Sequence, residues 1–293
     1  MRYYTYFPGC SAAHGGTKAY DLSTQATAKV LDIDLIELED WNCCGSTPYT
    51  SVDELASYCC SARNLALAEK KGFDMVTPCS ACFVLLTKTN NALKEYPALR
   101  AQVKETLAAG NLEYNGTVKV RHLLDIFAND IGYNNIKSQV KKDLNGLKVA
   151  PYYGCQIVRP GPSFDHPESP TTLDSLVNSL GAEAVQFPLK ARCCGGSLII
   201  SEEDVALDLL YKLFNSASSN GAQCIVTVCP LCQTNLDVYQ SKVNKKFKTN
   251  FNIPVLFFTQ LMGIAFGIES KALGLESCIV PTEKVLASYL TKR

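Results

Sequence analysis

The sequence lacks an excess of charge of either sign. Its 28 basic residues are matched by 28 acidic ones, so the formal net charge at pH 7 is +0. Proteins that bind nucleic acids or anionic membranes through electrostatic attraction usually carry an uncompensated basic surface. The charge balance gives no reason to expect either kind of partner, and we expect no nucleic acid.

Long hydrophobic runs are missing as well. The most apolar late stretch, Pro254 to Ile268, contains Thr259, Gln260 and two glycines and is too short to cross a bilayer. The first residues, Met1 to Cys10, resemble a strand and lack the cationic start and apolar centre of a signal peptide. We therefore expect no direct membrane span and a cytoplasmic location.

Nucleotide-binding motifs are also absent from the sequence. No G-x-G-x-x-G follows a predicted strand, and there is no phosphate-binding loop. We expect no flavin, nicotinamide or nucleotide site, so electrons would have to arrive from another protein.

Cysteine, by contrast, is abundant, with 14 in 293 residues. In a reducing compartment such a number favours metal binding or redox chemistry over a disulfide framework. Ten of them form a repeat, C-x32-CC-x34-C-x2-C in the first half and C-x37-CC-x34-C-x2-C in the second. The repeated cysteines are Cys10, Cys43, Cys44, Cys79 and Cys82, then Cys155, Cys193, Cys194, Cys229 and Cys232. Adjacent cysteines rarely bond to each other because the ring is strained, so the pairs need another explanation.

The segments around the cysteines repeat too. "YYTYFPGC" corresponds to "KVAPYYGC", and "GFDMVTPCSAC" corresponds to "GAQCIVTVCPLC". The polar stretch from Tyr133 to Leu147 separates the two copies. We place the boundary near Asn145 and predict two domains, residues 1–145 and 146–293.

Short β-rich runs alternate with helical patterns in both copies. The predicted strands are residues 3–7, 35–38, 74–77 and 118–121, and then 148–153, 184–187, 224–228 and 255–258. This order predicts an α/β fold of two homologous, pseudo-symmetric halves, each a mostly parallel sheet flanked by helices. Each repeated cysteine follows the C-terminal end of a strand, so five sulfurs should converge at one edge of each sheet.

The number and softness of these ligands favour an iron–sulfur cluster. Structural zinc takes four ligands, and five cysteines per half would leave one idle. Sulfur ligands select iron–sulfur clusters, although the linear cysteine run of a ferredoxin cubane is absent. A zinc-stabilised binding module is the alternative reading.

The doubled pattern resembles the cysteine-rich CCG domain, and the whole chain resembles the B subunit of heterodisulfide reductase and its bacterial relatives. The resemblance implies two noncubane [4Fe-4S] clusters, held by the five repeated cysteines of each half. It implies an oxidoreductase acting on a sulfur group, which reduces or reversibly forms a disulfide in a cavity between the clusters. Gln156 stands where a histidine is expected in methanogenic relatives, which favours another small thiol disulfide or a sulfur carrier as substrate.

The same resemblance implies partners. They are a ferredoxin-like iron–sulfur subunit of the C type and a flavoprotein subunit of the A type. Some relatives belong to succinate dehydrogenase-like complexes, so the alternative function is electron transfer from a dehydrogenase to quinone.

Other residues near the motifs are candidates for the site. We predict catalytic roles for His14, as a proton donor, and for Arg192, as a positive charge beside the second motif. Gly45, Gly195 and Gly196 are predicted to let backbone amides approach the cofactor. Solvated loop positions are the alternative for His14 and for the four cationic residues around the second motif, Arg159, His166, Lys190 and Arg192. Of these four, we favour a functional role only for Arg192 and Arg159.

The remaining candidates are expected to be structural. Free cysteine behaves as a small buried hydrophobe, which is our expectation for Cys59 and Cys60. Cys224 and Cys278 are expected to be core or surface thiols. His122, whose counterpart in the repeat we take to be Thr259, is expected to cap a helix or to make a hydrogen bond in the core.

Overall fold

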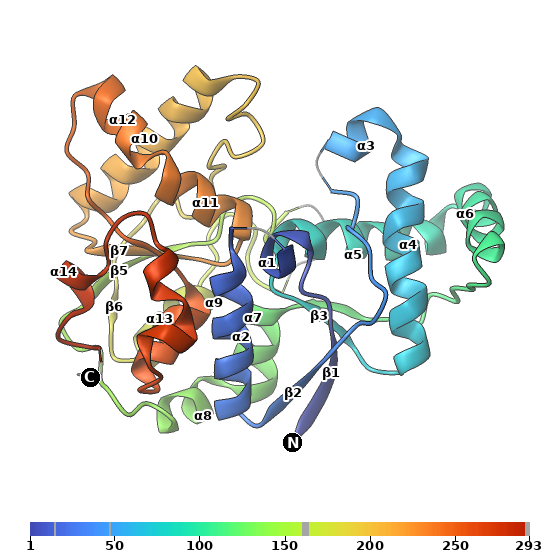
Figure 1. The fold of residues 1–293 in the computed structure, drawn as a ribbon, viewed down its shortest axis with the longest axis horizontal. Helices are drawn as coiled ribbons and strands as arrows, with labels where there is room; N and C mark the ends of the chain where they lie inside the picture. Colours follow the sequence, from blue (N-terminus) through green and yellow to red (C-terminus); the bar gives the residue numbers. More distant parts are fainter. Residues whose placement is uncertain (15, 47, 160–163, 291–293) are drawn as a thin grey trace.

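The chain forms two α/β halves, each built on a four-stranded parallel sheet (Figure 1). The computed structural model describes residues 1–14, 16–46, 48–159 and 164–290. The first sheet contains β1 (Arg2–Tyr6), β2 (Ile33–Glu37), β3 (Met75–Thr77) and β4 (Val120–His122). The second contains β5 (Lys148–Tyr152), β6 (Glu183–Ala184), β7 (Cys224–Thr227) and β8 (Val255–Phe257). The predicted fold class is confirmed.

The order of the strands is the same in both halves. It is β2-β1-β3-β4 in the first and β6-β5-β7-β8 in the second, and every recorded pairing is parallel. All three residues of β3 are fully buried, as expected for a strand covered by helices on both faces. In such a sheet, ligands bind outside the strand ends where the order reverses. That point lies between β1 and β3, and between β5 and β7.

The predicted strands are found at all eight places, with one correction. The segment predicted as a strand at 184–187 pairs only at Glu183–Ala184. Val185 and Phe187 still bury their side chains in the core, so the apolar pattern that predicted the strand reflects burial more than pairing.

Helices connect the strands in both halves. In the first half they are α1 (Cys10–His14), α2 (Lys18–Val30), α3 (Pro48–Val52), α4 (Glu54–Lys71), α5 (Ser80–Glu95), α6 (Pro97–Ala109), α7 (Leu123–Asp125), a π-helix (Ile126–Ile131) and α8 (Tyr133–Ser138). In the second half they are α9 (Thr172–Ser179), α10 (Glu203–Ser219), α11 (Pro230–Val238), α12 (Gln240–Phe247), α13 (Phe258–Ala265), two short 3-10 turns (Ser270–Leu273 and Leu275–Ser277) and α14 (Glu283–Leu286). No helix in the described ranges is both long and apolar enough to cross a membrane.

The two long helices α4 and α10 occupy corresponding places. In α4, the Asp53 carboxylate accepts a hydrogen bond from the Ala56 amide at 2.9 Å and caps the first turn. The helix ends at Gly72, whose φ of 75° is left-handed. Both helices carry the signals that predicted them, acidic residues in the first turn and a glycine just beyond the end.

The two halves share a continuous core. Helix α2 packs against α13, and Tyr20 stacks on Phe257 with ring centroids 4.0 Å apart. The hydroxyl groups of Ser23 and Thr259 are 2.7 Å apart across the same contact. The boundary near Asn145 stays a prediction; it falls in the turn between α8 and β5.

Candidate functional site

Six of the ten repeated cysteines follow the strands at which the chain order reverses, and the two adjacent pairs follow the edge strands β2 and β6. Cys10 begins α1 shortly after β1, and Cys79 is the residue that precedes α5, directly after β3. In the second half, Cys229 precedes α11 directly after β7. A thiol at a helix start lies near unpaired backbone amides and the positive end of the helix dipole, which favour thiolate.

The sulfurs meet in pairs within each half. The Sγ atoms of Cys10 and Cys43 are 3.9 Å apart, and those of Cys44 and Cys82 are 3.3 Å apart. In the second half the Sγ atoms of Cys194 and Cys232 are 3.5 Å apart, and Cys155 contacts Cys193. All fourteen cysteines are free thiols. Among the described residues, no three metal-binding side chains are grouped closely enough for a single ion.

Burial divides each set of five in the same way. In each half three of the five cysteines are buried: Cys44, Cys79 and Cys82 in the first, and Cys194, Cys229 and Cys232 in the second. The other two, Cys10 and Cys43, are exposed, whereas in the second half Cys193 is exposed and Cys155 is half-buried. Each site therefore has a dry inner side and an outer side that reaches solvent.

Of the two thiols on the outer side of each site, the one in the first cysteine of the adjacent pair has the lower pKa. Hydrogen bonds from the Cys10 and Cys44 thiols lower the pKa of Cys43 far below its usual value. The matching bonds from Cys155 and Cys194 do the same to the pKa of Cys193. Backbone amides add to this effect, since Gly195 N lies 3.3 Å from the Cys193 sulfur. The local environment thus supplies thiolate, the form that binds metal.

The cysteine sets of the two halves touch each other. Cys79 and Cys229 are joined by a hydrogen bond between their thiols, which is the largest influence on the Cys79 pKa and raises it. Nearby, the Val228 carbonyl oxygen accepts hydrogen bonds from Tyr20 and Ser80 of the first half, at 3.3 and 3.1 Å. The two sites therefore form one continuous cysteine-rich region.

Glycines allow this close packing. A Cβ added to Gly9 or to Gly154, whose φ angles are +77° and +69°, would lie 3.0 Å from the Cys82 sulfur or 3.1 Å from the Cys232 sulfur. Neither residue was among the predicted site residues, although the repeated Gly-Cys of "PGC" and "YGC" was a signal for both. At the predicted Gly196, an added Cβ would lie 3.3 Å from the Cys194 sulfur.

The turns that hold the adjacent cysteines are built differently. In the first half, Ser61 Oγ donates to the Cys44 carbonyl at 2.7 Å and Ser57 Oγ donates to the Gly45 carbonyl at 3.0 Å. In the second half, Asn235 Nδ2 of α11 donates to the Cys194 carbonyl at 2.8 Å. Gly195 instead packs against Ala206, where an added Cβ would lie 2.9 Å from the Cα atom.

A cleft lies between the halves, next to both sets of cysteines. It has a volume of about 700 Å³. Its walls include Ser46, directly after the first Cys-Cys-Gly turn, and Ser197, directly after the second Cys-Cys-Gly-Gly turn. Ala81 and Leu231, the inner residues of the two C-x2-C motifs, also line it. In Figure 1, α3, α4 and α5 lie on one side of the molecule and α10 and α12 on the other, with α11 between them.

The predicted catalytic residues are placed less clearly. His14 ends α1, but its side chain lies outside the described residues. Arg192 is exposed and its carbonyl accepts a hydrogen bond from Tyr152 at 2.7 Å. Arg192 is not among the described residues that line the cleft. The catalytic roles of His14 and Arg192 stay predictions.

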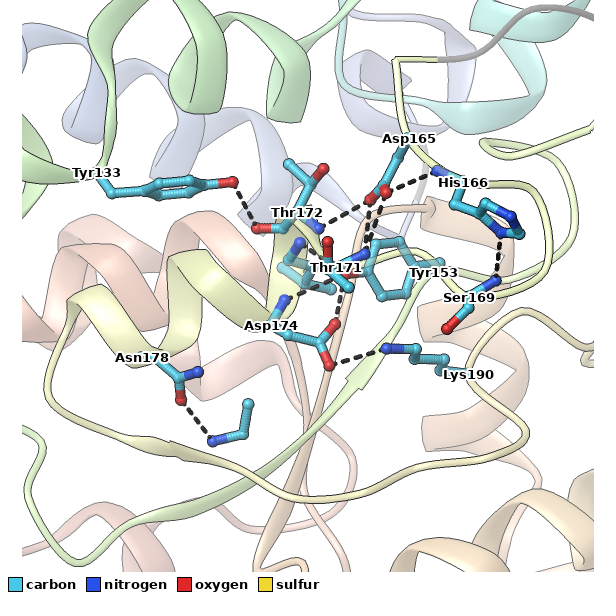
Figure 2. Close-up of polar contacts among 12 residues, drawn as sticks. Tyr133, Tyr153, Asp165, His166, Ser169, Thr171, Thr172, Asp174, Asn178 and Lys190 are labelled. Atoms are coloured by element: carbon cyan, nitrogen blue, oxygen red, sulfur yellow. Dashed lines mark hydrogen bonds and ion pairs between the residues drawn. The ribbon is translucent and has the colours of Figure 1, made fainter.

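Two of the other cationic residues have structural partners (Figure 2). Lys190 Nζ lies 2.9 Å from the Asp174 carboxylate, which also accepts from the Tyr153 hydroxyl. The His166 ring nitrogen accepts the backbone amides of Glu168 and Ser169, at 3.2 and 3.0 Å. His166 thus organises the loop that leads to α9, and Lys190 contacts the first turn of α9 itself.

His122, which was expected to be structural, corresponds to a different residue of the second half from the one predicted. His122 Nδ1 accepts from the Leu124 amide at 3.1 Å and caps α7, as expected. Strand register places His122 opposite Thr77 and Phe257 opposite Thr227, so the counterpart of His122 is Phe257 and not Thr259.

The extra cysteines lie apart from the repeated frame. Cys224 is buried in β7, and burial raises the pKa of its thiol to about 12. Burial also raises the pKa of Cys278 to about 12, in the tail of the chain. Cys59 and Cys60 are half-buried on α4. Structural roles for these four thiols stay predictions.

Comparison with known proteins identifies the family. The model of the CCG cysteine-rich domain matches twice, at residues 4–87 and 149–237. The chain is 38% identical to the membrane anchor of the 8-methylmenaquinol:fumarate reductase of Wolinella succinogenes, over 96% of this chain and 98% of that one. It is 32% identical to the B subunit of the ferredoxin/F(420)H(2)-dependent CoB-CoM heterodisulfide reductase of Methanosarcina acetivorans, over 90% of each chain.

Two further comparisons agree. The chain is 31% identical to a protein of Archaeoglobus profundus that is named as similar to the B subunit of heterodisulfide reductase, over 99% of each chain. The crystal structure of a hypothetical protein from Helicobacter pylori shares the fold, with a TM-score of 0.76 and 17% identity over 96% of this chain and 52% of that one. The chain belongs to the CCG cysteine-rich domain family, carries that domain twice, and is an iron–sulfur protein of the same type as the B subunit of heterodisulfide reductase.

Proposed function

We propose that this chain is the catalytic component of a heterodisulfide reductase-like complex, which reduces or reversibly forms a disulfide at two noncubane [4Fe-4S] clusters. The observation that carries the proposal is the placement of two equivalent sets of five cysteines beside one cleft between the halves. A disulfide bound there would have one set of cysteines for each of its two sulfurs.

The residues present fit such clusters. The donor set is sulfur throughout, and the pKa is strongly lowered at Cys43 in the first half and at Cys193 and Cys229 in the second. Thiolate ligands of this kind select iron–sulfur clusters over harder metal ions. The first cluster would be held by Cys10, Cys43, Cys44, Cys79 and Cys82, and the second by Cys155, Cys193, Cys194, Cys229 and Cys232. Gly9, Gly154 and Gly196 leave space beside these sulfurs that a side chain would fill.

The chain's own residues would hold and orient the substrate. The clusters, when bound, supply single electrons and sites for sulfur. The cleft would place the substrate between the starts of α5 and α11, against Ala81 and Leu231, and positioning of this kind can supply much of a rate enhancement. His14 is the residue we propose as the proton donor to a departing thiolate.

Electrons would arrive from other proteins of the complex. Relatives are named as subunits of larger reductases, so this chain is one component of such an assembly. The partners we propose are a ferredoxin-like iron–sulfur protein and a flavoprotein.

A second function is supported by a specific comparison. The relative at 38% identity belongs to an 8-methylmenaquinol:fumarate reductase. In that case the chain would pass electrons between a dehydrogenase of the succinate dehydrogenase type and a quinone, without disulfide chemistry.

Analysis of anaerobically purified protein tests both proposals. We expect iron and acid-labile sulfide sufficient for two clusters; zinc without sulfide would contradict both functions. Electron paramagnetic resonance of the oxidised protein should show a signal that depends on added thiol if sulfur binds at a cluster. Disulfide reduction and quinone reduction, assayed in parallel with a chemical electron donor, would then separate the first function from the second.

A further inference from the structure

The cleft between the halves is almost free of charge. Lys88 of α5 is the one ionisable residue among the described residues that line it. The other lining side chains are uncharged: most are aliphatic, such as Val84 and Ile200, or small hydroxyls, such as Ser201, and Gln156 adds an amide. A site that binds an anionic ligand usually presents arginine or several unpaired cations.

The single lysine is already paired. Its Nζ atom lies 3.4 Å from the Glu54 carboxylate and 5.4 Å from the centre of the Tyr58 ring. The positive charge therefore already has an anionic partner before any ligand enters. An anion would have to compete with Glu54 for Lys88.

Exposed carboxylates follow two of the lining segments in the sequence. They are Asp53 and Glu54 after Ser51, and Glu202, Glu203 and Asp204 after Ser201. Three of these five carboxylates pair with lysines, Glu54 with Lys88, Glu203 with Lys242 and Asp204 with Lys246. None of these five carboxylates is among the described residues that line the cleft.

From these observations we propose that the cleft takes an uncharged redox ligand with an apolar body, and that the Glu54–Lys88 ion pair sets this preference. The inference rests on the proposed function, in which a redox-active molecule binds between the two sets of cysteines. A neutral disulfide and a quinone both have this chemistry. A disulfide that carries carboxylate, sulfonate or phosphate groups does not.

Two pairs of ligands test the preference. Bis(2-hydroxyethyl) disulfide is compared with the disulfide of thioglycolate, which has a similar size and carries two carboxylates. 1,4-Naphthoquinone is compared with its 2-sulfonate. Binding to the oxidised, cluster-loaded protein is measured by isothermal titration calorimetry under anaerobic conditions, so that no turnover is needed. Where a pair of ligands binds, we expect its neutral member to bind at least about tenfold more tightly than its anionic member.

The ion pair has a matched control in the second half. Glu203, like Glu54, is the first residue of its helix, and it pairs with Lys242, which lies 5.3 Å from the centre of the Tyr239 ring. Only the Glu54 pair contributes a residue to the described lining of the cleft. Glu54→Gln should tighten binding of the anionic members by about twofold to fivefold, because it frees the charge of Lys88. Glu203→Gln should leave both affinities unchanged.

Three results would overturn the inference. Anionic members that bind as tightly as neutral ones would contradict the preference and leave the proposed function standing. Equal effects of Glu54→Gln and Glu203→Gln would show that the preference does not come from the cleft. If no member of either pair binds, the proposed function fails, and the preference with it.

Discussion

The two halves of this protein hold the same frame of cysteines with different supporting side chains. Around the first adjacent pair, serine hydroxyls of α4 bind the carbonyls of Cys44 and Gly45. Around the second pair, α10 presents aliphatic carbon, and the supporting hydrogen bond comes from Asn235 of α11. The ends of the parallel strands bring the sulfurs together in both halves, so the side chains that brace each turn were free to diverge.

The fourth strands differ in the same way. Register pairs Arg121 with Val76 in the first sheet and Leu256 with Val226 in the second, so a buried cation in one half corresponds to an aliphatic residue in the other. Arg121 binds the carboxylates of Asp125 and Asp130, at 2.7 and 2.6 Å. The first half thus uses polar interactions where the second half uses apolar packing.

The largest expected effect comes from removing one predicted ligand in either half. Cys44→Ala or Cys194→Ala should each abolish one cluster, because each removes a buried sulfur that contacts the second cysteine of its C-x2-C motif. Iron, acid-labile sulfide and the electron paramagnetic resonance spectrum of the anaerobically purified variants would show the loss. Cys60→Ala is the control, since Cys60 lies outside the repeated frame. Loss of a cluster in that variant would contradict the ligand assignment.

Much of this arrangement could be predicted from the sequence. The repeat predicted two α/β halves, and the alternation of strands and helices placed the cysteines at one edge, because parallel strands end on the same side of a sheet. The contact between Cys79 and Cys229 could not be predicted, because a repeat fixes each half but not the way the two halves pack. The neutrality of the cleft was also not predicted. Glu54 and Lys88 are separated by 34 positions and pair only in the folded chain.

Arg121 offers the next largest contrast between the halves. Arg121→Met should lower the free energy of unfolding by about 3 kcal/mol, because it leaves largely buried carboxylates without their cation. Leu256→Met, at the corresponding place in the second half, should cost less than about 1.5 kcal/mol. Urea unfolding followed by circular dichroism measures both. Equal losses would show that the polar network adds nothing beyond packing.

The same network predicts a pH dependence. Burial raises the pKa of Asp130, but hydrogen bonds from Arg121 and Tyr4 outweigh it, so the pKa is lower in the folded protein. The stabilisation is therefore complete above the pKa of an unfolded aspartate, about 3.9, and is lost as the pH falls through the lower folded value. The stability difference between the native protein and Arg121→Met should shrink below about pH 4. Urea unfolding of the two proteins across this pH range measures the difference.

The glycine turns give a smaller contrast. Gly195→Ala places a Cβ 2.9 Å from the Ala206 Cα atom at a φ of +78°, so both the backbone and a neighbouring helix must adjust. We expect a loss of about 3 kcal/mol at most, from the left-handed conformation and the crowding together. Gly72→Ala has a similar φ, +75°, with nothing within 4 Å of the added Cβ, and should lose only about 1 kcal/mol. If the two variants were equally stable, crowding at the cysteine turn would be unimportant.

The smallest expected effect tests whether the polar bracing of the first turn matters. Ser61→Ala removes the hydrogen bond to the Cys44 carbonyl inside a buried site, and should cost about 1 kcal/mol of unfolding free energy. Ser218→Ala, on the exposed end of α10, serves as the control and should be neutral or slightly stabilising, since alanine is the better helix former. Urea unfolding of the two variants side by side measures the difference. If Ser61→Ala leaves the free energy of unfolding unchanged, the sheet edge alone positions the first cysteine pair. The serines of α4 would then be dispensable, as expected from the second half, where α10 presents aliphatic carbon at the corresponding place.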